Sequence, residues 1–309
     1  MEHLEVVKFL MDKGADANKC LRLASEGGHL EVVKFLFGKG ADIHAVSEYA
    51  LLWASRGGLE VVKFLVKNGA DVTANNNIAL RYSVHLEVVK FLTEKGTNLN
   101  TNNSEASHLD VIKFLVEKGA DVTANNNQAL RWASRYGHLQ VVKFLVEKGA
   151  DIRANDNEAI TWASSASHLK IVKFLAEKGA DVTVNDNEAI RWASRSGHLK
   201  VVKFLVKNGA DISANDNEAV RWASRFGHLE IVKFLIEKGA DTRANDNEAV
   251  RWASRSGNLE VVKFLVKNGA DISANDNEAV RWASRLGYLQ TVKFFPRLFG
   301  HSQFTNFIL

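Results

Sequence analysis

A short sequence recurs along this chain and constrains its fold more than any other feature. Lys-Phe-Leu is followed by Gly-Ala-Asp, and in the second half of the chain the glycine returns every 30 residues. These regularly spaced glycines are Gly119, Gly149, Gly179, Gly209, Gly239 and Gly269. Copies nearer the N-terminus are spaced at shorter intervals, and their glycines are Gly14, Gly40, Gly69 and Gly96. Such a period predicts a repeat array in which each unit packs on its neighbours, rather than one or two globular domains.

Residues 211–240 form one unit, and its first half predicts a helix. Asn and Asp are good N-cap residues, and Asn215 with Glu218 matches a capping box. Apolar residues then recur at helical spacing and predict one apolar face. The predicted face consists of Ala219, Trp222, Ala223 and Phe226.

The second half of the unit predicts another helix, over residues 229–238. Gly227 separates it from the first helix, and Gly239 supplies the left-handed residue that commonly follows a helix end. The second helix is apolar over most of its circumference, which requires cover on several sides. A unit of 30 residues cannot offset its own ordering entropy, at about 1.5 kcal/mol per residue. We therefore expect an all-α, helix–turn–helix solenoid in which stacked units share one core.

One motif returns almost unchanged in the second half of each unit. It reads Gly-His-Leu-Glu-Val-Val-Lys-Phe-Leu-Val-Glu-Lys-Gly-Ala-Asp, with small changes at 137–151, 197–211 and 227–241. This motif resembles the ankyrin repeat, and the resemblance covers nearly the whole chain. It implies non-catalytic protein binding through the concave face of the first helices and the adjoining loops.

The units depart from the ankyrin pattern in length. They have 30 residues, whereas the family unit has about 33, and the missing residues lie between Ala214 and Glu218, where the family places a β-hairpin finger. We therefore expect stubby fingers. The first-helix sequence Asn-Glu-Ala-(Val/Ile)-Arg-Trp-Ala-Ser resembles, more narrowly, the mimivirus-like ankyrin families of giant DNA viruses that infect amoebae. That resemblance implies interaction with host proteins in the host cytoplasm.

The spacing of the repeats divides the chain into four segments. Residues 1–96 carry degenerate repeats, 97–118 carry a damaged repeat without its first helix, and 119–295 carry the regular 30-residue units. Residues 296–309 form a tail without repeat character, which is either a cap or unrelated appended sequence. We expect residues 98–107 to be a loop that interrupts the stack.

Composition narrows the functional classes. Lys and Arg number 40 against 36 Asp and Glu, and the resulting charge of +4 is too small to imply nucleic acid by itself. The single cysteine, Cys20, excludes an intramolecular disulfide framework. The sequence has no apolar run long enough for a membrane span, and it lacks the basic start typical of a signal peptide. We expect an intracellular, cytoplasmic monomer without a membrane partner.

The sequence contains no recognisable catalytic or metal-binding motif. A Walker loop, a dinucleotide-binding fingerprint and HExxH are all absent from it. Eight of the ten histidines precede a leucine at the start of a second helix. Successive copies would lie about 10 Å apart, too far to share a metal ion, so we expect them to bond the backbone of the turn. We predict that the chain is not an enzyme and has neither cofactor nor metal.

Tryptophan recurs at one position of the first helix. These residues are Trp53, Trp132, Trp162, Trp192, Trp222, Trp252 and Trp282. Because the position lies on the predicted apolar face, we expect the indoles to pack in the core. The alternative is a stacking ladder for bases or sugars.

Arginines form two columns on the same side of the first helices, because they are four residues apart. The first column is Arg131, Arg191, Arg221, Arg251 and Arg281, and the second is Arg135, Arg195, Arg225, Arg255 and Arg285. The columns form either a basic strip for a partner or a set of internal ion pairs. We favour internal pairing, since Glu188, Glu218 and their copies lie three residues before an arginine of the first column.

The position after the second arginine varies from unit to unit, as a recognition surface would. Exposed aromatic residues beside arginines are typical binding hot spots. The candidate partner-binding residues are Arg135, Tyr136, Arg195, Arg225, Phe226, Arg255, Arg285 and Leu286. We predict a protein partner; the alternatives are an electrostatic nucleic-acid binder, which we do not favour, and a decaying family member without a specific partner.

Overall fold

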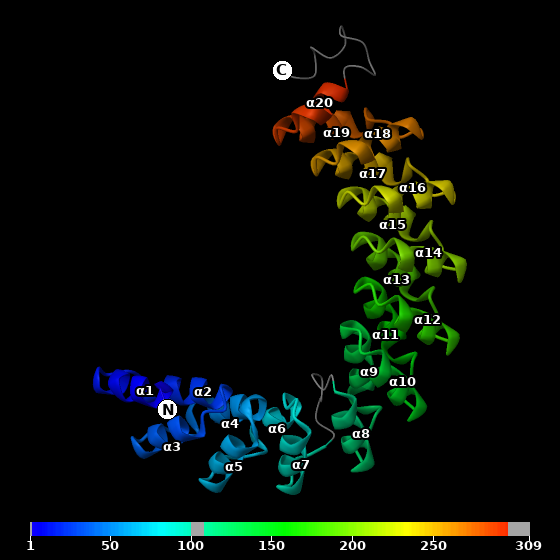
Figure 1. Ribbon diagram of the computed structural model, residues 1–309. Coiled ribbons are helices and arrows are strands. Elements are labelled where there is room, and N and C mark those ends of the chain that lie inside the picture. The colour runs from blue at the N-terminus through cyan, green and yellow to red at the C-terminus, as the bar shows by residue number, and fades with distance from the viewer. Residues whose placement is uncertain (1, 100–107, 296–309) are drawn as a thin grey trace. The chain divides into compact units, whose positions relative to one another are not determined.

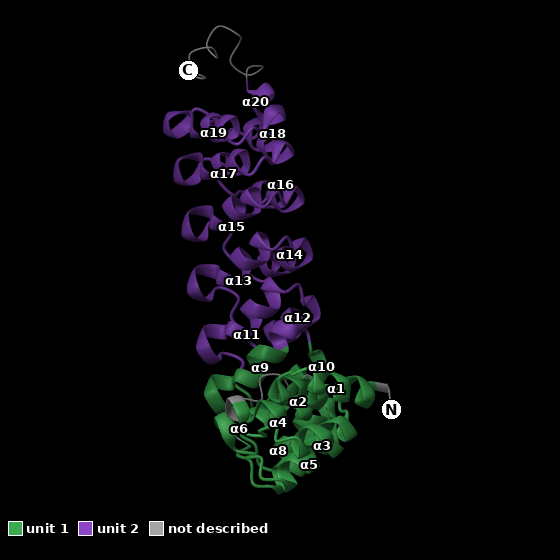
Figure 2. Cartoon of the chain, turned by 90° about the vertical axis from the view of Figure 1, so that its left-hand side faces the viewer, with its two compact units in different colours: residues 1–133, 138–151 green, residues 134–137, 152–309 purple. Residues whose placement is uncertain are grey.

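The computed structural model describes residues 2–99 and 108–295, and this part of the chain contains 20 helices and no β-strand (Figure 1). The predicted all-α solenoid of helix pairs is confirmed. The described residues form two compact units, one of residues 1–133 and 138–151, the other of residues 134–137 and those from 152 onward (Figure 2). The predicted loop lies mostly, and the predicted tail wholly, outside the described residues. The four-segment division of the chain stays a prediction.

The first compact unit holds the N-terminal helices. They are α1 (Glu2–Asp12), α2 (Ala17–Glu26), α3 (Leu30–Gly38), α4 (Ala45–Gly57), α5 (Leu59–Lys67), α6 (Ala74–Arg81), α7 (Leu86–Glu94), α8 (Leu109–Glu117), most of α9 (Ala124–Tyr136) and α10 (Leu139–Glu147). The second helices α7 and α8 pack directly against each other, and among the described residues no first helix lies between them in the chain.

The second compact unit consists of the regular helix pairs. Its helices are α11 (Ala154–Ser165), α12 (Leu169–Glu177), α13 (Val184–Arg195), α14 (Leu199–Lys207), α15 (Ala214–Arg225), α16 (Leu229–Glu237), α17 (Ala244–Arg255), α18 (Leu259–Lys267), α19 (Ala274–Arg285) and α20 (Leu289–Phe294). The odd-numbered first helices stack in one row, and the even-numbered second helices stack in another row beside it (Figure 1).

Small residues bring the first helices close together. On α15 the buried residues include Ala219, Val220 and Ala223, each at most 1% exposed. Phe226, which the spacing placed on the same apolar face, is 44% exposed, so this part of the prediction is wrong. The buried stripe is shifted round the helix toward Val220, because only short side chains fit where two first helices meet. Larger core residues come from both rows of helices, such as Leu235 on a second helix and Ile160 on a first helix, and both are fully buried.

Each first helix of the regular units contains a short left-handed turn close to its start. Asn215, Asp216 and Asn217 have φ of 51°, 54° and 59°. Asn and Asp tolerate this region better than other residues with a side chain, because their short polar groups bond locally. No side-chain cap bond forms at the start of α15, so the predicted capping box is wrong.

The left-handed turn stands where an ankyrin finger would be, and it connects consecutive units. The side-chain oxygen of Asn217 accepts a hydrogen bond from the backbone N–H of Asp241 in the next unit, at 2.8 Å. Asn127, Asn157, Asn187 and Asn247 make the same contact in their units. A fixed link between units therefore takes the place of a protruding hairpin.

Candidate functional site

The second arginine column packs against the tryptophans. The guanidinium carbon of Arg195 lies 4.7 Å from the ring centroid of Trp192 and 4.8 Å from that of Trp222. Arg225 lies 5.1 Å from the rings of both Trp222 and Trp252. A cation at this distance is attracted by the negative face of the ring, by about 0.5–2 kcal/mol.

The same packing continues toward the C-terminus. Arg255 lies 4.2 Å and Arg285 5.4 Å from the ring of Trp282. We call this set the arginine–tryptophan ladder; its members are Arg195, Arg225, Arg255, Arg285, Trp192, Trp222, Trp252 and Trp282. Further along the face, Arg135 lies 5.0 Å from the ring of Trp162.

The predicted burial of the tryptophans in the core is wrong. The six tryptophans from Trp132 to Trp282 are all partly or largely exposed, and Trp192 is 39% exposed. An indole is too large for the narrow space between first helices that meet through alanine. It lies instead at the edge of that contact, where the arginine side chains cover its faces.

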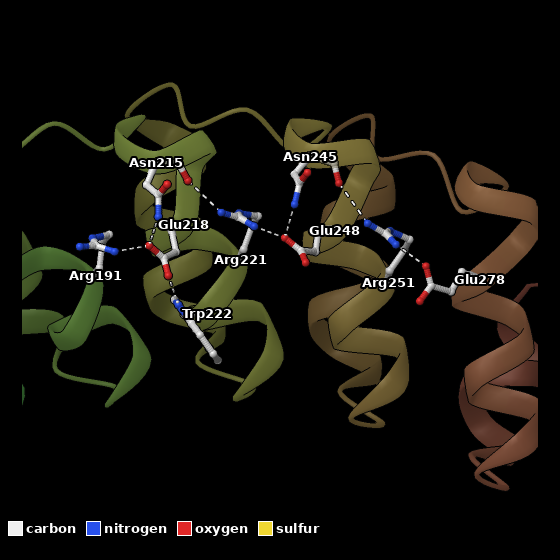
Figure 3. Close-up of polar contacts among 9 residues, drawn as sticks. All are labelled: Arg191, Asn215, Glu218, Arg221, Trp222, Asn245, Glu248, Arg251 and Glu278. Atoms are coloured by element: carbon white, nitrogen blue, oxygen red, sulfur yellow. Dashed lines mark hydrogen bonds and ion pairs between the residues drawn. The ribbon is translucent and has the colours of Figure 1, made fainter. Parts of the chain in front are cut away.

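The first arginine column is paired, but across units. Arg191 of α13 bonds Glu218 of α15, Arg221 bonds Glu248, and Arg251 bonds Glu278 (Figure 3). Internal pairing is therefore confirmed for these three arginines, whereas the partner expected from the spacing, a glutamate in the same helix, is wrong. For the second column the predicted internal pairing is wrong, because its members from Arg195 to Arg285 form no ion pair with any described residue. The second Nη of Arg221 also donates to the backbone oxygen of Asn215, at 2.8 Å.

Each of these glutamates collects several donors. Glu218 accepts hydrogen bonds from Asn215 at 2.5 Å and from the indole N–H of Trp222 at 2.6 Å, in addition to Arg191 (Figure 3). At Glu278, burial raises the pKa, but hydrogen bonds from Arg251, Trp282 and Asn275 outweigh it and lower the pKa to about 2. The carboxylate thus fixes both the neighbouring arginine and the edge of the indole.

The histidines of the turns hold the backbone of the second arginine column. The Nε2–H of His228 donates to the backbone oxygen of Arg195 at 2.9 Å, and His168 bonds that of Arg135 at 3.0 Å. In the next unit Asn258 donates to the backbone oxygen of Arg225 at 2.9 Å. The predicted backbone contact of these histidines is confirmed, and it reaches the preceding unit rather than the local turn.

The candidate binding residues lie where the first helices end. Tyr136 is 52%, Phe226 44% and Leu286 46% exposed. The structure brings two arginines to the exposed ring of Phe226. The guanidinium carbons of Arg195 and Arg225 lie 5.5 and 5.8 Å from its centroid. The arginines at 195, 225, 255 and 285 form no ion pair with any residue in the described part of the chain.

Two of the second helices carry an ion pair within the helix. Lys233 contacts Glu230 at 2.7 Å on α16, and Lys263 contacts Glu260 at 2.7 Å on α18. The lysines of α12 and α14 form no ion pair with any described residue. The two sides of this compact unit differ in their apolar surface: the ends of the first helices expose Phe226 and Leu286 beside unpaired arginines, whereas α12, α14, α16 and α18 expose no large apolar side chain.

The sequence comparisons agree with the helix pairs. A family model for ankyrin repeats, spanning three copies, matches residues 21–103, 104–156, 153–216 and 215–276, and a model for the Sel1 repeat matches residues 265–289. No curated protein matches the chain significantly. Within the described ranges, no helix is long and apolar enough to cross a membrane. The matched segments cover most of the sequence, and the chain belongs to the ankyrin repeat family.

Proposed function

We propose that this chain is a non-catalytic scaffold that binds a protein partner through the exposed side of its first helices and the adjoining short loops. Ankyrin and Sel1 repeats are generally protein–protein interaction modules. The observation that carries the proposal is the contrast between the two sides of the second compact unit. Exposed Phe226 and Leu286 stand beside arginines that have no ion pair among the described residues, whereas the second helices α12, α14, α16 and α18 expose no large apolar side chain.

The cluster of Arg195, Arg225 and Phe226 has the properties of a binding hot spot. The indoles and the turn residues of the next unit already hold both arginines, so little side-chain entropy is lost on binding. An ordered guanidinium offers a planar fork of donors to a carboxylate, and an exposed ring buries a large area at low entropic cost. Arg135 with Tyr136, and Arg285 with Leu286, repeat this pairing elsewhere on the same side.

A protein partner fits this surface better than nucleic acid does. Bases would need open indole faces, but Trp222 and Trp252 pack against each other at 4.9 Å and against Arg225. Exposed Asp216 and Asp246 stand at the start of the same first helices and would repel a continuous polyanion. We propose that the chain acts as a monomer in the cytoplasm. The resemblance to giant-virus families makes host proteins the candidate partners.

The test is a change of affinity for a captured partner. The full chain is used to capture proteins from a cell lysate, and the binding of each purified candidate is measured with three forms of the chain. We expect Arg225→Glu with Phe226→Ala to weaken binding more than tenfold, about 1.4 kcal/mol, without loss of helicity. The matched control, Glu230→Ala with Lys233→Ala on α16, should leave binding unchanged.

Three outcomes would contradict the proposal. If the α16 changes abolish binding and the α15 changes do not, the second helices are the recognition surface. If binding instead falls steeply with salt and a nucleic acid competes for it, the chain is an electrostatic nucleic-acid binder. If no protein binds specifically, the chain is a family member without a specific partner.

A further inference from the structure

One regular unit lacks both of its arginines. Helix α11 has Thr161 where the neighbouring units have the first arginine, and Ser165 where they have the second. In the following units Arg195 packs on Trp192 and Trp222, and Arg225 packs on Trp222 and Trp252. The serine at position 165 supplies no guanidinium to the rings of Trp162 and Trp192.

A cavity opens at this place. Its volume is about 270 Å³, and it is lined by Trp162, Trp192, Thr161, Ser165, Glu158 and Glu188, with Arg135 at its edge. Trp192 is the most exposed tryptophan among the described residues, at 39%, which follows from the missing arginine cover. The cavity is thus an unfilled copy of a position that the chain fills itself in the next units. We call it the arginine slot.

The slot also contains a carboxylate that lacks the cation found at its counterparts. Glu218, Glu248 and Glu278 each receive an arginine from the preceding unit. Their counterpart Glu188 would receive it from position 161, which is threonine, and Glu188 forms no ion pair with any described residue. Glu188 instead accepts a hydrogen bond from the indole N–H of Trp192, at 3.0 Å. The hydroxyl of Thr161, a residue only 3% exposed, has no hydrogen-bond partner in the described structure.

We propose that the arginine slot binds the guanidinium of an arginine side chain supplied by a protein partner. The bound group takes the place that Arg195 and Arg225 occupy in the following units, against two indoles and beside a carboxylate. The inference rests on the proposed function in one respect, because the arginine belongs to a protein partner.

The chemistry of the slot selects a guanidinium over other groups. The carboxylate of Glu188, which has no cation among the described residues, favours a cation over an anion in the slot. A planar guanidinium packs on aromatic rings and presents a fork of N–H donors to a carboxylate, which a compact, strongly hydrated ammonium does not. The chain itself uses arginine, never lysine, in the equivalent positions at 195, 225, 255 and 285.

The slot can be tested on the full chain with a small probe. The seven tryptophans are labelled with ¹⁵N, and their indole N–H signals are followed by NMR during titration with Nα-acetyl-arginine methylamide. We expect the signals of Trp162 and Trp192 to shift, and the others to stay in place. The citrulline analogue, which has the same shape without the charge, and the lysine analogue should produce at least tenfold weaker binding.

Variants of the slot provide the controls. Ser165→Arg supplies the missing guanidinium from the chain itself, so we expect it to block the probe and to raise the melting temperature. Ser256→Arg adds the same side chain at an exposed position outside the slot, and this matched variant should bind the probe normally. Should Ser165→Arg fail to fold, Glu188→Gln replaces it; this change keeps the shape of the side chain and should weaken probe binding at least tenfold.

The proposal is overturned if the arginine probe shifts neither indole signal, if Ser165→Arg binds the probe as well as Ser256→Arg does, or if the lysine analogue binds as tightly as the arginine probe. Its failure is separable from failure of the proposed function. If the probe does not bind but the Arg225 and Phe226 changes weaken partner binding, only the slot assignment is wrong. If the probe binds and those changes have no effect, the slot stands and the proposed hot spot is wrong.

Discussion

Arg221 on α15 bonds the carboxylate of Glu248 on α17, and both side chains are nearly buried, at 10% and 13% exposure. The two residues lie 27 positions apart, so the bond joins one repeat to the next. Equivalent bonds at Arg191 and Arg251 make a continuous set of links along the first helices (Figure 3). The stability of neighbouring units is therefore coupled through charges as well as through apolar contact.

Breaking one such link should be costly. Arg221→Ala leaves Glu248 in a mostly buried place without its cation, and we expect a loss of about 3 kcal/mol in the free energy of unfolding. Urea denaturation of the full chain, followed by circular dichroism, measures this loss. The control is Lys233→Ala, which breaks an exposed pair on α16 and should cost about 0–1 kcal/mol. Equal effects of the two changes would show that the link between units does not contribute.

The lowered pKa of Glu278 predicts sensitivity to acid. Because its pKa falls from 4.5 in the unfolded chain to about 2 in the folded chain, the ionised form stabilises the fold. That contribution is complete above a pH of about 4.5 and is lost as the pH falls toward 2. We expect Glu278→Gln to lower the melting temperature at neutral pH and to flatten its decline in acid. Melts recorded across this pH range test the expectation, which fails if variant and parent decline in parallel.

The first compact unit should respond to pH in the opposite direction. A hydrogen bond to Glu48, at 2.5 Å, raises the pKa of His44 above 6.5. The protonated form therefore stabilises the fold below that pH, and the stabilisation is lost as the pH rises through the raised pKa. We expect the unit to become less stable from pH 6 to pH 8, measured by hydrogen exchange in its helices. His44→Gln should remove this dependence.

The backbone at Glu48 predicts a stabilising substitution. Glu48 has a φ of 67° and is 5% exposed, and it stands where the regular units have asparagine, as at Asn157. Asparagine tolerates the left-handed region, which costs other residues about 1–2 kcal/mol. We expect Glu48→Asn to increase the free energy of unfolding by about 1 kcal/mol at a pH above the raised pKa of His44, where that side chain is neutral. A decrease in denaturation experiments at that pH would contradict the backbone argument.

The partial exposure of the tryptophans predicts a moderate cost for removing one. Trp222→Ala deletes contacts with Arg195 and Arg225 and a hydrogen bond to Glu218, but opens little of the core, so we expect a loss of about 2 kcal/mol. Leu235→Ala, at a fully buried position, should cost about 3–5 kcal/mol. Chemical denaturation of both variants decides the order; a larger loss for Trp222 would place its indole in the core after all.

The sequence alone determined the repeat, the helix pairs, the glycine turns and the ankyrin family, because these depend on spacings within a single unit. Gly227 and Gly239, for example, end their helices with φ of 77° and 99°, as their positions predicted. The candidate residues Tyr136, Phe226 and Leu286 were also recognisable as variable positions beside arginines, and they are exposed.

Tertiary structure alone decided which side of each first helix is buried and which residues meet across units. The helical spacing of the sequence does not show whether Val220 or Trp222 is the core residue. The distance to the next helix decides this, because helices that meet through alanines leave no room for an indole between them. The same stacking brings Arg191 to Glu218 of the next unit, although a glutamate stands nearer in its own helix. Contacts between neighbouring repeats depend on how closely the helices approach, and the spacing within one repeat does not contain that distance.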